Sequence, residues 1–215
     1  MDLPIDFHTH KVMPYYNGVY VLNHIVERKN TVPDAKYFTA GIHPWHLSAL
    51  PEKKDGIQLL AAHPNCIAVG ECGIDKLCVN NLETQKTIFE FQCELAAGLN
   101  KPMVIHAVKA HFDCISLLKN HGIKKAVFHG FNSRYTILEK ILQDGYMVSF
   151  GAAILQEKSQ AAALIKLVPP SRFFLETDDS GQSIYTIYHK AGEIFSLDQK
   201  ELTAQLHKNF NTFIA

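Results

Sequence analysis

The sequence predicts an α/β fold, a (β/α)8 barrel distorted at its start because helices are missing after the first strands. The chain has 215 residues, of which 47% are hydrophobic, and this fits one sizeable domain with a full core. Eight short runs rich in β-branched, aromatic or apolar residues lie near 3–7, 19–25, 37–41, 66–70, 102–105, 126–128, 146–150 and 172–175. Most of the later runs precede a segment with helical periodicity, and such alternation indicates parallel strands. We therefore expect a single barrel over residues 1–215.

Three segments between the later strands show a clear apolar stripe with helical spacing. They are residues 83–99, 111–120 and 133–143. A glycine lies near the end of each, at Gly98, Gly122 and Gly145, where a left-handed residue is expected to stop the helix. A fourth helix is predicted to begin after Asp198, since Glu201 completes a capping box. Its apolar stripe is expected to cover the barrel and consists of Leu202, Leu206, Phe210 and Phe213.

The connections at the start of the chain are too short for crossover helices. Residues 11–18 contain Pro14 and Gly18, and residues 27–36 contain Pro33. Parallel strands need a connection of about a dozen residues or more, and proline interrupts a helix. The first strands are therefore expected to form an irregular, open or antiparallel start.

The composition sets limits on location and partners. Acidic and basic residues balance at 21 each, so the chain has no general attraction for polyanions. The five cysteines form no C-x-x-C pair, which favours reduced thiols in a cytoplasmic protein. We expect neither export nor membrane insertion, because no basic leader or long apolar run is present. Nothing in the sequence predicts an obligatory protein partner.

The stretch that begins at Asp6 carries the first candidate metal ligands. His8 and His10 are two residues apart at the end of an apolar run, so on a strand both rings point to the same side. For an isolated pair, two solvated histidines at a strand end would be the simpler interpretation. Other candidate ligands at later strand ends favour the metal interpretation.

Functional side chains of a barrel come from the C-terminal ends of its strands. Each of the relevant runs ends in a candidate ligand, and together these are His8, His10, Glu71, His106, His129 and Asp178. Four imidazoles and two carboxylates suit Zn²⁺ or Mn²⁺, and Mg²⁺ less well. Six ligands exceed the need of one ion, so we expect two divalent cations about 3.5–4 Å apart, with one bridging carboxylate.

At these motifs the sequence resembles the TatD-type metal-dependent hydrolases, which belong to the amidohydrolase-like barrels. The matching segments are 6–10, Gly-Ile-His-Pro at 41–44, 70–75, 83–85, 102–106 and 176–178. The resemblance implies that His8, His10 and Asp178 hold one metal ion. It also implies that Glu71 bridges, that His106 and His129 hold the second ion, and that the activity is metal-dependent DNA hydrolysis.

Three departures from the family pattern affect the expected contacts with substrate. Val108 stands where the family usually has an arginine two residues after the fifth-strand histidine, so an expected phosphate contact is missing. Residues 130–133 read Gly-Phe-Asn-Ser in place of Cys-Phe-Ser-Gly, and Asp179 follows Asp178 with no proline. The set of ligands is complete, whereas the substrate contacts are altered.

The residues suggest a mechanism and several substrate contacts. Metal ions would lower the pKa of a water molecule, and Asp178 is the candidate general base. Candidates for contacts with substrate oxygens are His43, His46, Lys76 and Lys109. His43 could instead fix its loop, and the two lysines could be ordinary solvated charges. Asp75 is expected to fix the loop after Glu71 or to orient a ligand histidine.

The leading prediction is a metal-dependent deoxyribonuclease or phosphodiesterase acting on DNA. The alternative keeps the metal ions and changes the substrate to a small lactone, amide or phosphate ester, because the arginine is absent and the net charge is zero. A barrel that has lost activity and serves as a scaffold is a third hypothesis, which fits poorly with a complete set of ligands.

Overall fold

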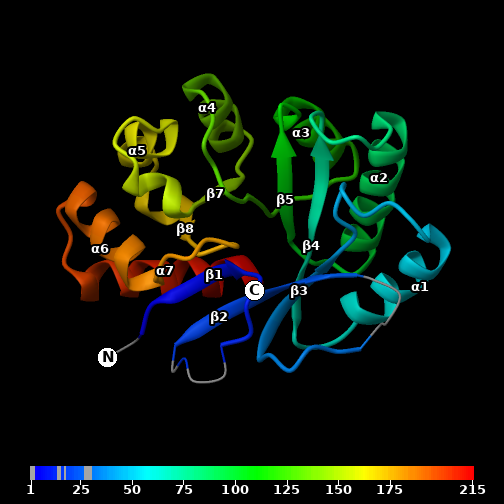
Figure 1. The fold of residues 1–215 in the computed structure, drawn as a ribbon, viewed down its shortest axis with the longest axis horizontal. Coiled ribbons are helices and arrows are strands. Elements are labelled where there is room, and N and C mark those ends of the chain that lie inside the picture. The colour runs from blue at the N-terminus through cyan, green and yellow to red at the C-terminus, as the bar shows by residue number, and fades with distance from the viewer. Residues whose placement is uncertain (1–2, 14–15, 17, 27–30) are drawn as a thin grey trace. The chain divides into compact units, whose positions relative to one another are not determined.

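The computed structural model describes residues 3–13, 16, 18–26 and 31–215, and its elements are labelled in Figure 1. The chain forms two compact units. Unit 1 consists of Met1–Leu22 and His129–Ala215, and unit 2 consists of Asn23–Phe128. The single domain predicted from sequence stays a prediction.

Unit 1 contains both ends of the described chain. Its elements are β1 (Ile5–Thr9), the first residues of β2 (Val19–Ile25), α4 (Tyr135–Gln143), β7 (Met147–Phe150), η1 (Ala152–Leu155), α5 (Gln160–Leu164), η2 (Ile165–Leu167), η3 (Pro170–Arg172), β8 (Phe173–Leu175), α6 (Ile184–Phe195) and α7 (Gln199–Ile214). Strand β1 pairs in parallel with β2, and β7 pairs in parallel with β8. A parallel bridge between Thr9 and Asp178 joins β1 to the segment just after β8.

Unit 2 alternates strands with helices. Its elements after β2 are β3 (Tyr37–Gly41), α1 (Leu50–Ala61), β4 (Cys66–Asp75), α2 (Leu82–Gly98), β5 (Met103–Val108), α3 (His111–Asn120) and β6 (Ala126–Phe128). The strand order is β3-β4-β5-β6, and each neighbouring pair is parallel. The C-terminal ends of these strands therefore lie at one edge of the unit 2 sheet, and the loops that follow them share that edge.

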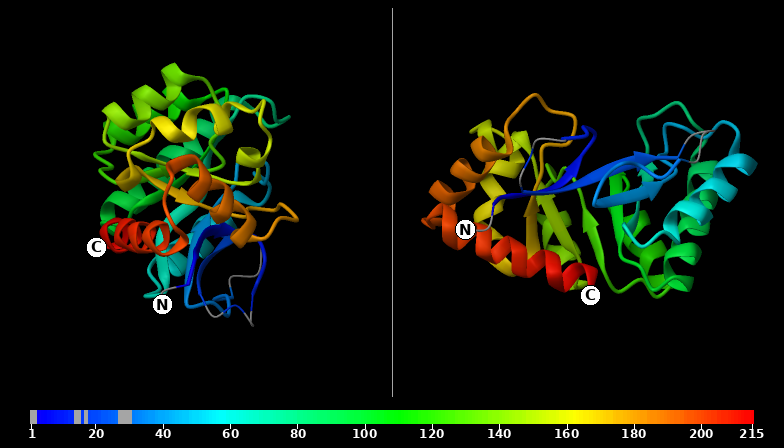
Figure 2. Two further views of the ribbon diagram at one scale, coloured as in Figure 1. Left: turned by 90° about the vertical axis from the view of Figure 1, so that its left-hand side faces the viewer. Right: turned by 90° about the horizontal axis from the view of Figure 1, so that it is seen from below.

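The C-terminal helix covers unit 1 as predicted. Helix α7 begins after Asp198 with the expected capping box, and it lies against β1 and β8 (Figure 2). Phe7 of β1 stacks on Phe174 of β8 with ring centroids 4.0 Å apart, and the Phe213 ring of α7 meets Phe7 edge-on at 5.5 Å. This aromatic cluster fixes the strands that carry the first candidate ligands.

Most strand predictions are confirmed, and β4 is the main exception. The run predicted to end at Gly70 continues as a fully buried strand to Asp75. Glu71 therefore lies within β4, and it does not follow the strand as expected. The left-handed stops are confirmed at Gly122 and Gly145 but not at Gly98, because the left-handed residue after α2 is Asn100.

The start of the chain is irregular but parallel. The antiparallel alternative is wrong, because β1 and β2 pair in parallel. Within residues 3–13, 16, 18–26 and 31–36 the structure has no helix, as predicted for the first two connections. Residues 14, 15, 17 and 27–30, which belong to the same prediction, lie outside the described residues.

Three α-helices, α1, α5 and α6, were not predicted from sequence. Helix α1 begins without a side-chain cap, and the residue before it, Ala49, is left-handed, so the usual signal of a helix start is absent. Helix α6 begins after a serine cap at Ser183, a local signal of a helix start that the prediction missed. Among the described residues, no helix has the length and apolar character needed to cross a membrane.

Candidate functional site

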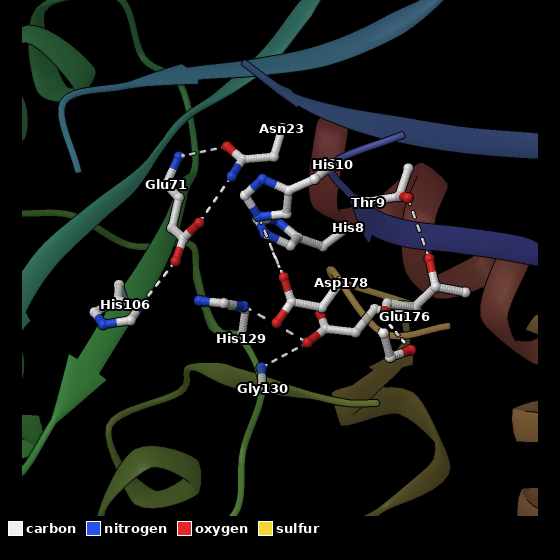
Figure 3. A network of polar contacts seen from close by, with 12 residues as sticks. His8, Thr9, His10, Asn23, Glu71, His106, His129, Gly130, Glu176 and Asp178 are labelled. Atoms are coloured by element: carbon white, nitrogen blue, oxygen red, sulfur yellow. Dashed lines mark hydrogen bonds and ion pairs between the residues drawn. The ribbon is translucent and has the colours of Figure 1, made fainter. Parts of the chain in front are cut away.

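The first cluster lies in unit 1, where β1 and β8 end. Nε2 of His10 is 3.2 Å from Oδ1 of Asp178, and Nε2 of His8 is 3.8 Å from the same oxygen (Figure 3). The backbone N–H of Asp178 donates to the carbonyl of His8 at 2.8 Å, and that of His10 donates to the carbonyl of Asp178 at 3.4 Å. The parallel bridge thus holds the three side chains together.

The exposure of these three residues differs. His8 is fully buried, whereas the side chains of His10 and Asp178 are 32% and 33% exposed. Donor atoms of all three lie within 4.8 Å of one another. Two imidazole nitrogens and a carboxylate oxygen at this spacing fit a divalent cation. The structure therefore brings together the three ligands that the resemblance assigns to one ion.

His129 and Glu176 add a second carboxylate contact in unit 1. The ring of His129 lies 4.4 Å from that of His8, and its Nδ1 is 3.6 Å from Oε1 of Glu176. Glu176 is fully buried and accepts hydrogen bonds from the Gly130 N–H at 2.7 Å and the Ser149 hydroxyl at 2.5 Å. The sequence analysis assigned Glu176 no role. Its position directly after the eighth apolar run was the available signal, because functional side chains of a barrel come from the C-terminal ends of its strands.

Asp6 ties β1 to the segment that carries Asp178. Its carboxylate accepts from the N–H of Thr177 at 2.9 Å and from the Thr177 hydroxyl at 2.6 Å. Burial raises the pKa of Asp6 to about 7, and the two hydrogen bonds from Thr177 oppose that rise. Asp6 was quoted only as part of a motif in the sequence analysis. In the structure it fixes Thr177, the neighbour of the candidate ligand Asp178.

The second cluster lies in unit 2 around Glu71 of β4. Oε1 of Glu71 lies 2.8 Å from Nδ1 of His106 and 3.1 Å from Nε2 of His43. Oε2 accepts a hydrogen bond of 2.7 Å from the side-chain amide of Asn23, whose oxygen accepts from the Glu71 N–H at 3.1 Å (Figure 3). Donor atoms of His43, Glu71 and His106 also lie within 4.8 Å of one another. Glu71 is thus buried and oriented at both of its oxygens.

Two residues of this cluster lie directly against Glu71. His43 is only 4% exposed and contacts Glu71, and its Nδ1 accepts from the Trp45 backbone N–H, in line with the alternative that His43 fixes its loop. Asn23 was not singled out at all. Its partner Glu71 is 48 residues away in the sequence, and no local pattern reveals such a contact.

Asp75 organises the edge of the unit 2 cluster. Its carboxylate accepts from the indole N–H of Trp45 at 2.7 Å and from the Leu77 N–H at 2.8 Å, and it lies 3.5 Å from Nε2 of His106. Burial raises the pKa of Asp75, but the hydrogen bonds from Trp45 and Leu77 together with His106 outweigh this effect and lower it. The expectation that Asp75 fixes the loop after Glu71 is confirmed, and Asp75 also lies beside His106, a candidate ligand.

The remaining candidates for substrate contact lie on loops of unit 2. The ring centroid of His46 is 5.8 Å from that of His43. Lys76 forms an ion pair of 2.5 Å with Asp113, as expected of a surface charge. Lys109 is exposed and has a left-handed backbone with φ of 53°. The substrate contacts of all four residues stay predictions.

Comparison with known proteins identifies the family. The family described as TatD related DNase matches residues 7–213. A 3'-5' ssDNA/RNA exonuclease TatD of Erwinia tasmaniensis is 36% identical over 152 residues, which cover 68% of this chain and 59% of the relative. The enzyme of the same name from Musicola paradisiaca is 31% identical over 169 residues, covering 75% and 63%. The matches therefore span less than two thirds of the length of these relatives.

Solved structures show the same fold. A TatD homologue from Escherichia coli K12 superposes with a TM-score of 0.83 at 22% identity, covering 98% of this chain and 97% of its own. A TatD family hydrolase from Entamoeba histolytica has a TM-score of 0.82 at 18% identity, covering 99% and 98%. The fold is thus the predicted barrel of parallel strands with helices between them. The sequence match over nearly its whole length shows that the chain belongs to the TatD related DNase family.

Proposed function

We propose that this protein is a divalent-metal-dependent hydrolase that cleaves phosphodiester bonds of DNA. The observation that carries the proposal is a pair of carboxylate–imidazole clusters, one in each unit, in a chain of the TatD family. Relatives named as single-strand DNA and RNA exonucleases support a single-stranded nucleic acid as substrate.

Each cluster has the donor atoms that a divalent cation requires. In unit 1 the ligands would be His8, His10 and Asp178, and in unit 2 they would be Glu71 and His106 with His43 beside them. Nitrogen and carboxylate donors suit Zn²⁺ and Mn²⁺ better than Mg²⁺. A bound cation would supply Lewis-acid activation of water and neutralisation of phosphate charge.

The proton of the attacking water would go to Asp178. Its carboxylate is one-third exposed, so water can reach it, and the backbone bridge to β1 fixes its position. A carboxylate oxygen of Asp178 would accept the proton as the water oxygen attacks phosphorus and the P–O bond to the leaving sugar breaks. The buried Glu71 would keep His106 oriented through their contact of 2.8 Å.

Several parts of the sequence analysis stay predictions alongside this proposal. These are the bridging role of Glu71, the pairing of His106 with His129 on the second ion, and the count of two ions. The cytoplasmic location also stays a prediction. It was based on reduced thiols, and all five cysteines are free in the structure. The absence of an obligatory protein partner likewise stays a prediction.

The proposal predicts that hydrolysis of single-stranded DNA requires both a divalent cation and His106. Purified protein should release nucleotides from a labelled oligonucleotide, and a chelator should abolish release until Mn²⁺ or Zn²⁺ is restored. His106→Ala should lower the rate by about a hundredfold or more, because it removes a ligand and the partner of Glu71. His189→Ala is the matched control, since the side chain of His189 on α6 is 73% exposed.

The same assay tests the alternative substrate class. Val108 at the end of β5 stands where the family usually provides a phosphate-binding arginine, and this favours small esters or lactones. A panel of lactones, amides and phosphate monoesters should therefore be assayed beside the oligonucleotide. If the protein turns over a panel compound and shows no metal-dependent cleavage of DNA, the proposed nuclease activity is contradicted.

A further inference from the structure

The indole ring of Trp45 is held in place at the surface of unit 2. Trp45, the only tryptophan of the chain, lies in the loop between β3 and α1 and is 58% exposed. Its N–H donates to the buried Asp75 carboxylate at 2.7 Å, and its backbone N–H donates to Nδ1 of His43 at 3.2 Å. Because the indole N–H is already bonded, Trp45 offers apolar ring surface to solvent.

The loop around Trp45 is also fixed. The side-chain amide of Asn80 donates to the carbonyl of Pro44 at 2.7 Å, which ties the loop after β3 to the loop after β4. The Trp45 ring stands nearly perpendicular to the rings of His43 and His106, at 84° and 76°, with centroids 5.0 and 5.9 Å away. A flat aromatic surface is therefore presented beside two residues of the candidate metal cluster.

A large aromatic ring that is held exposed at this position indicates that a bound molecule covers it. Tryptophan is mostly buried in folded proteins, and a ring left in water loses the free energy that its burial would give. Exposed Leu77 and the exposed lysine Lys109 lie on the loops that follow the neighbouring strands β4 and β5. Aromatic surface combined with positive charge is typical of proteins that bind single-stranded nucleic acids, in which unpaired bases stack on aromatic rings.

We infer that Trp45 stacks on an unpaired nucleobase of a single-stranded substrate whose neighbouring phosphate lies at the cluster of Glu71 and His106. The inference rests on the proposed function and adds how the substrate is held. It gives the chain a base contact that does not depend on the arginine replaced by Val108. It also favours single strands over duplexes, because the bases of a duplex are already stacked on one another.

Fluorescence of the single tryptophan tests this inference. The full chain with Asp178→Asn should bind without turnover, and asparagine accepts the left-handed backbone of position 178. A short oligothymidylate should quench the fluorescence, whereas an abasic oligomer of equal length and charge should not. Equal quenching by the two oligomers, with equal affinity, would overturn the inference.

Substitutions separate stacking from the structural role of the indole N–H. Trp45→Ala in the Asp178→Asn chain should weaken oligothymidylate binding, measured by anisotropy of a labelled strand, by about tenfold or more. Trp45→Phe should retain most of the affinity, because phenylalanine also stacks on a base. It loses the hydrogen bond to Asp75, so it separates the two roles of the indole. Leu59→Ala is the control, since Leu59 on α1 is 63% exposed. A Phe variant as weak as the Ala variant would show that the bond to Asp75 matters and that stacking does not.

Turnover assays distinguish the two proposals. In the otherwise unaltered chain, Trp45→Ala should raise the KM for single-stranded DNA by about tenfold and change kcat much less. If the unaltered chain cleaves DNA and Trp45→Ala cleaves it with the same KM, the stacking inference fails and the nuclease stands. If the unaltered chain cleaves no oligonucleotide, the nuclease fails and the inference falls with it.

Discussion

Glu71 shows how a single residue of this protein depends on partners remote in sequence. Its carboxylate faces two imidazoles at one oxygen and the Asn23 amide at the other. Asn23 also accepts from the Glu71 N–H, so one side chain fixes both the backbone and the carboxylate of that residue. Asn23 is therefore a positioning residue, which acts through Glu71 and makes no contact with substrate in the proposed mechanism.

At this scale, we predict that Asn23→Ala lowers both stability and activity. The substitution leaves a buried carboxylate oxygen and a buried N–H without the partner that Asn23 provides, which costs about 1–3 kcal/mol. Urea denaturation should show that loss, and the DNA hydrolysis rate at saturating metal should fall about tenfold or more. The exposed Asn120, replaced by alanine, should change neither quantity. Full activity in Asn23→Ala would contradict the positioning role.

At the scale of elements, β4 determines where the unit 2 ligands lie. The strand continues past Gly70 to Asp75, and Gly73 pairs with His106 of β5. Gly73 has φ of +145°, and an added Cβ would collide with the His106 carbonyl oxygen. A glycine is required at this position because the two strands approach so closely beside a ligand.

We therefore predict that Gly73→Ala is strongly destabilising. The backbone conformation alone should cost about 1–3 kcal/mol, and the collision with β5 adds to this. Gly98→Ala is the contrasting variant, since Gly98 ends α2 and a Cβ there meets nothing within 4 Å. That change should leave the free energy of unfolding unchanged or raise it by about 0.5–1 kcal/mol. Equal effects of the two substitutions would contradict this account of β4.

At the scale of the whole molecule, stability should depend on pH through a partly buried histidine, His111. Burial and, to a smaller extent, the nearby His106 together lower the pKa of His111 from 6.5 to about 4. Between these values the unfolded chain binds a proton that the folded chain does not. The free energy of unfolding must therefore fall as the pH decreases from about 6.5 to 4.

We predict that His111→Gln removes part of this acid sensitivity. Denaturant curves at several pH values, with a chelator present, should show a shallower decline for the variant than for the unaltered chain. The two declines should differ by up to about 3 kcal/mol at pH 4. The absolute stability of the variant is expected to be lower, because the ring of His111 packs against Phe128. Parallel declines in the two proteins would contradict the assignment to His111.

The sequence by itself determined the class of fold, most of the strands, the C-terminal helix and the candidate ligands. These features depend on local signals, namely hydrophobic periodicity, the capping box at Asp198 and the ends of apolar runs. Only the tertiary structure decided that Asn23 holds Glu71, that Asp6 holds Thr177 and that Asp75 fixes Trp45. Those contacts join residues 30 to 171 positions apart, so the folded backbone brings them together and no local pattern encodes them.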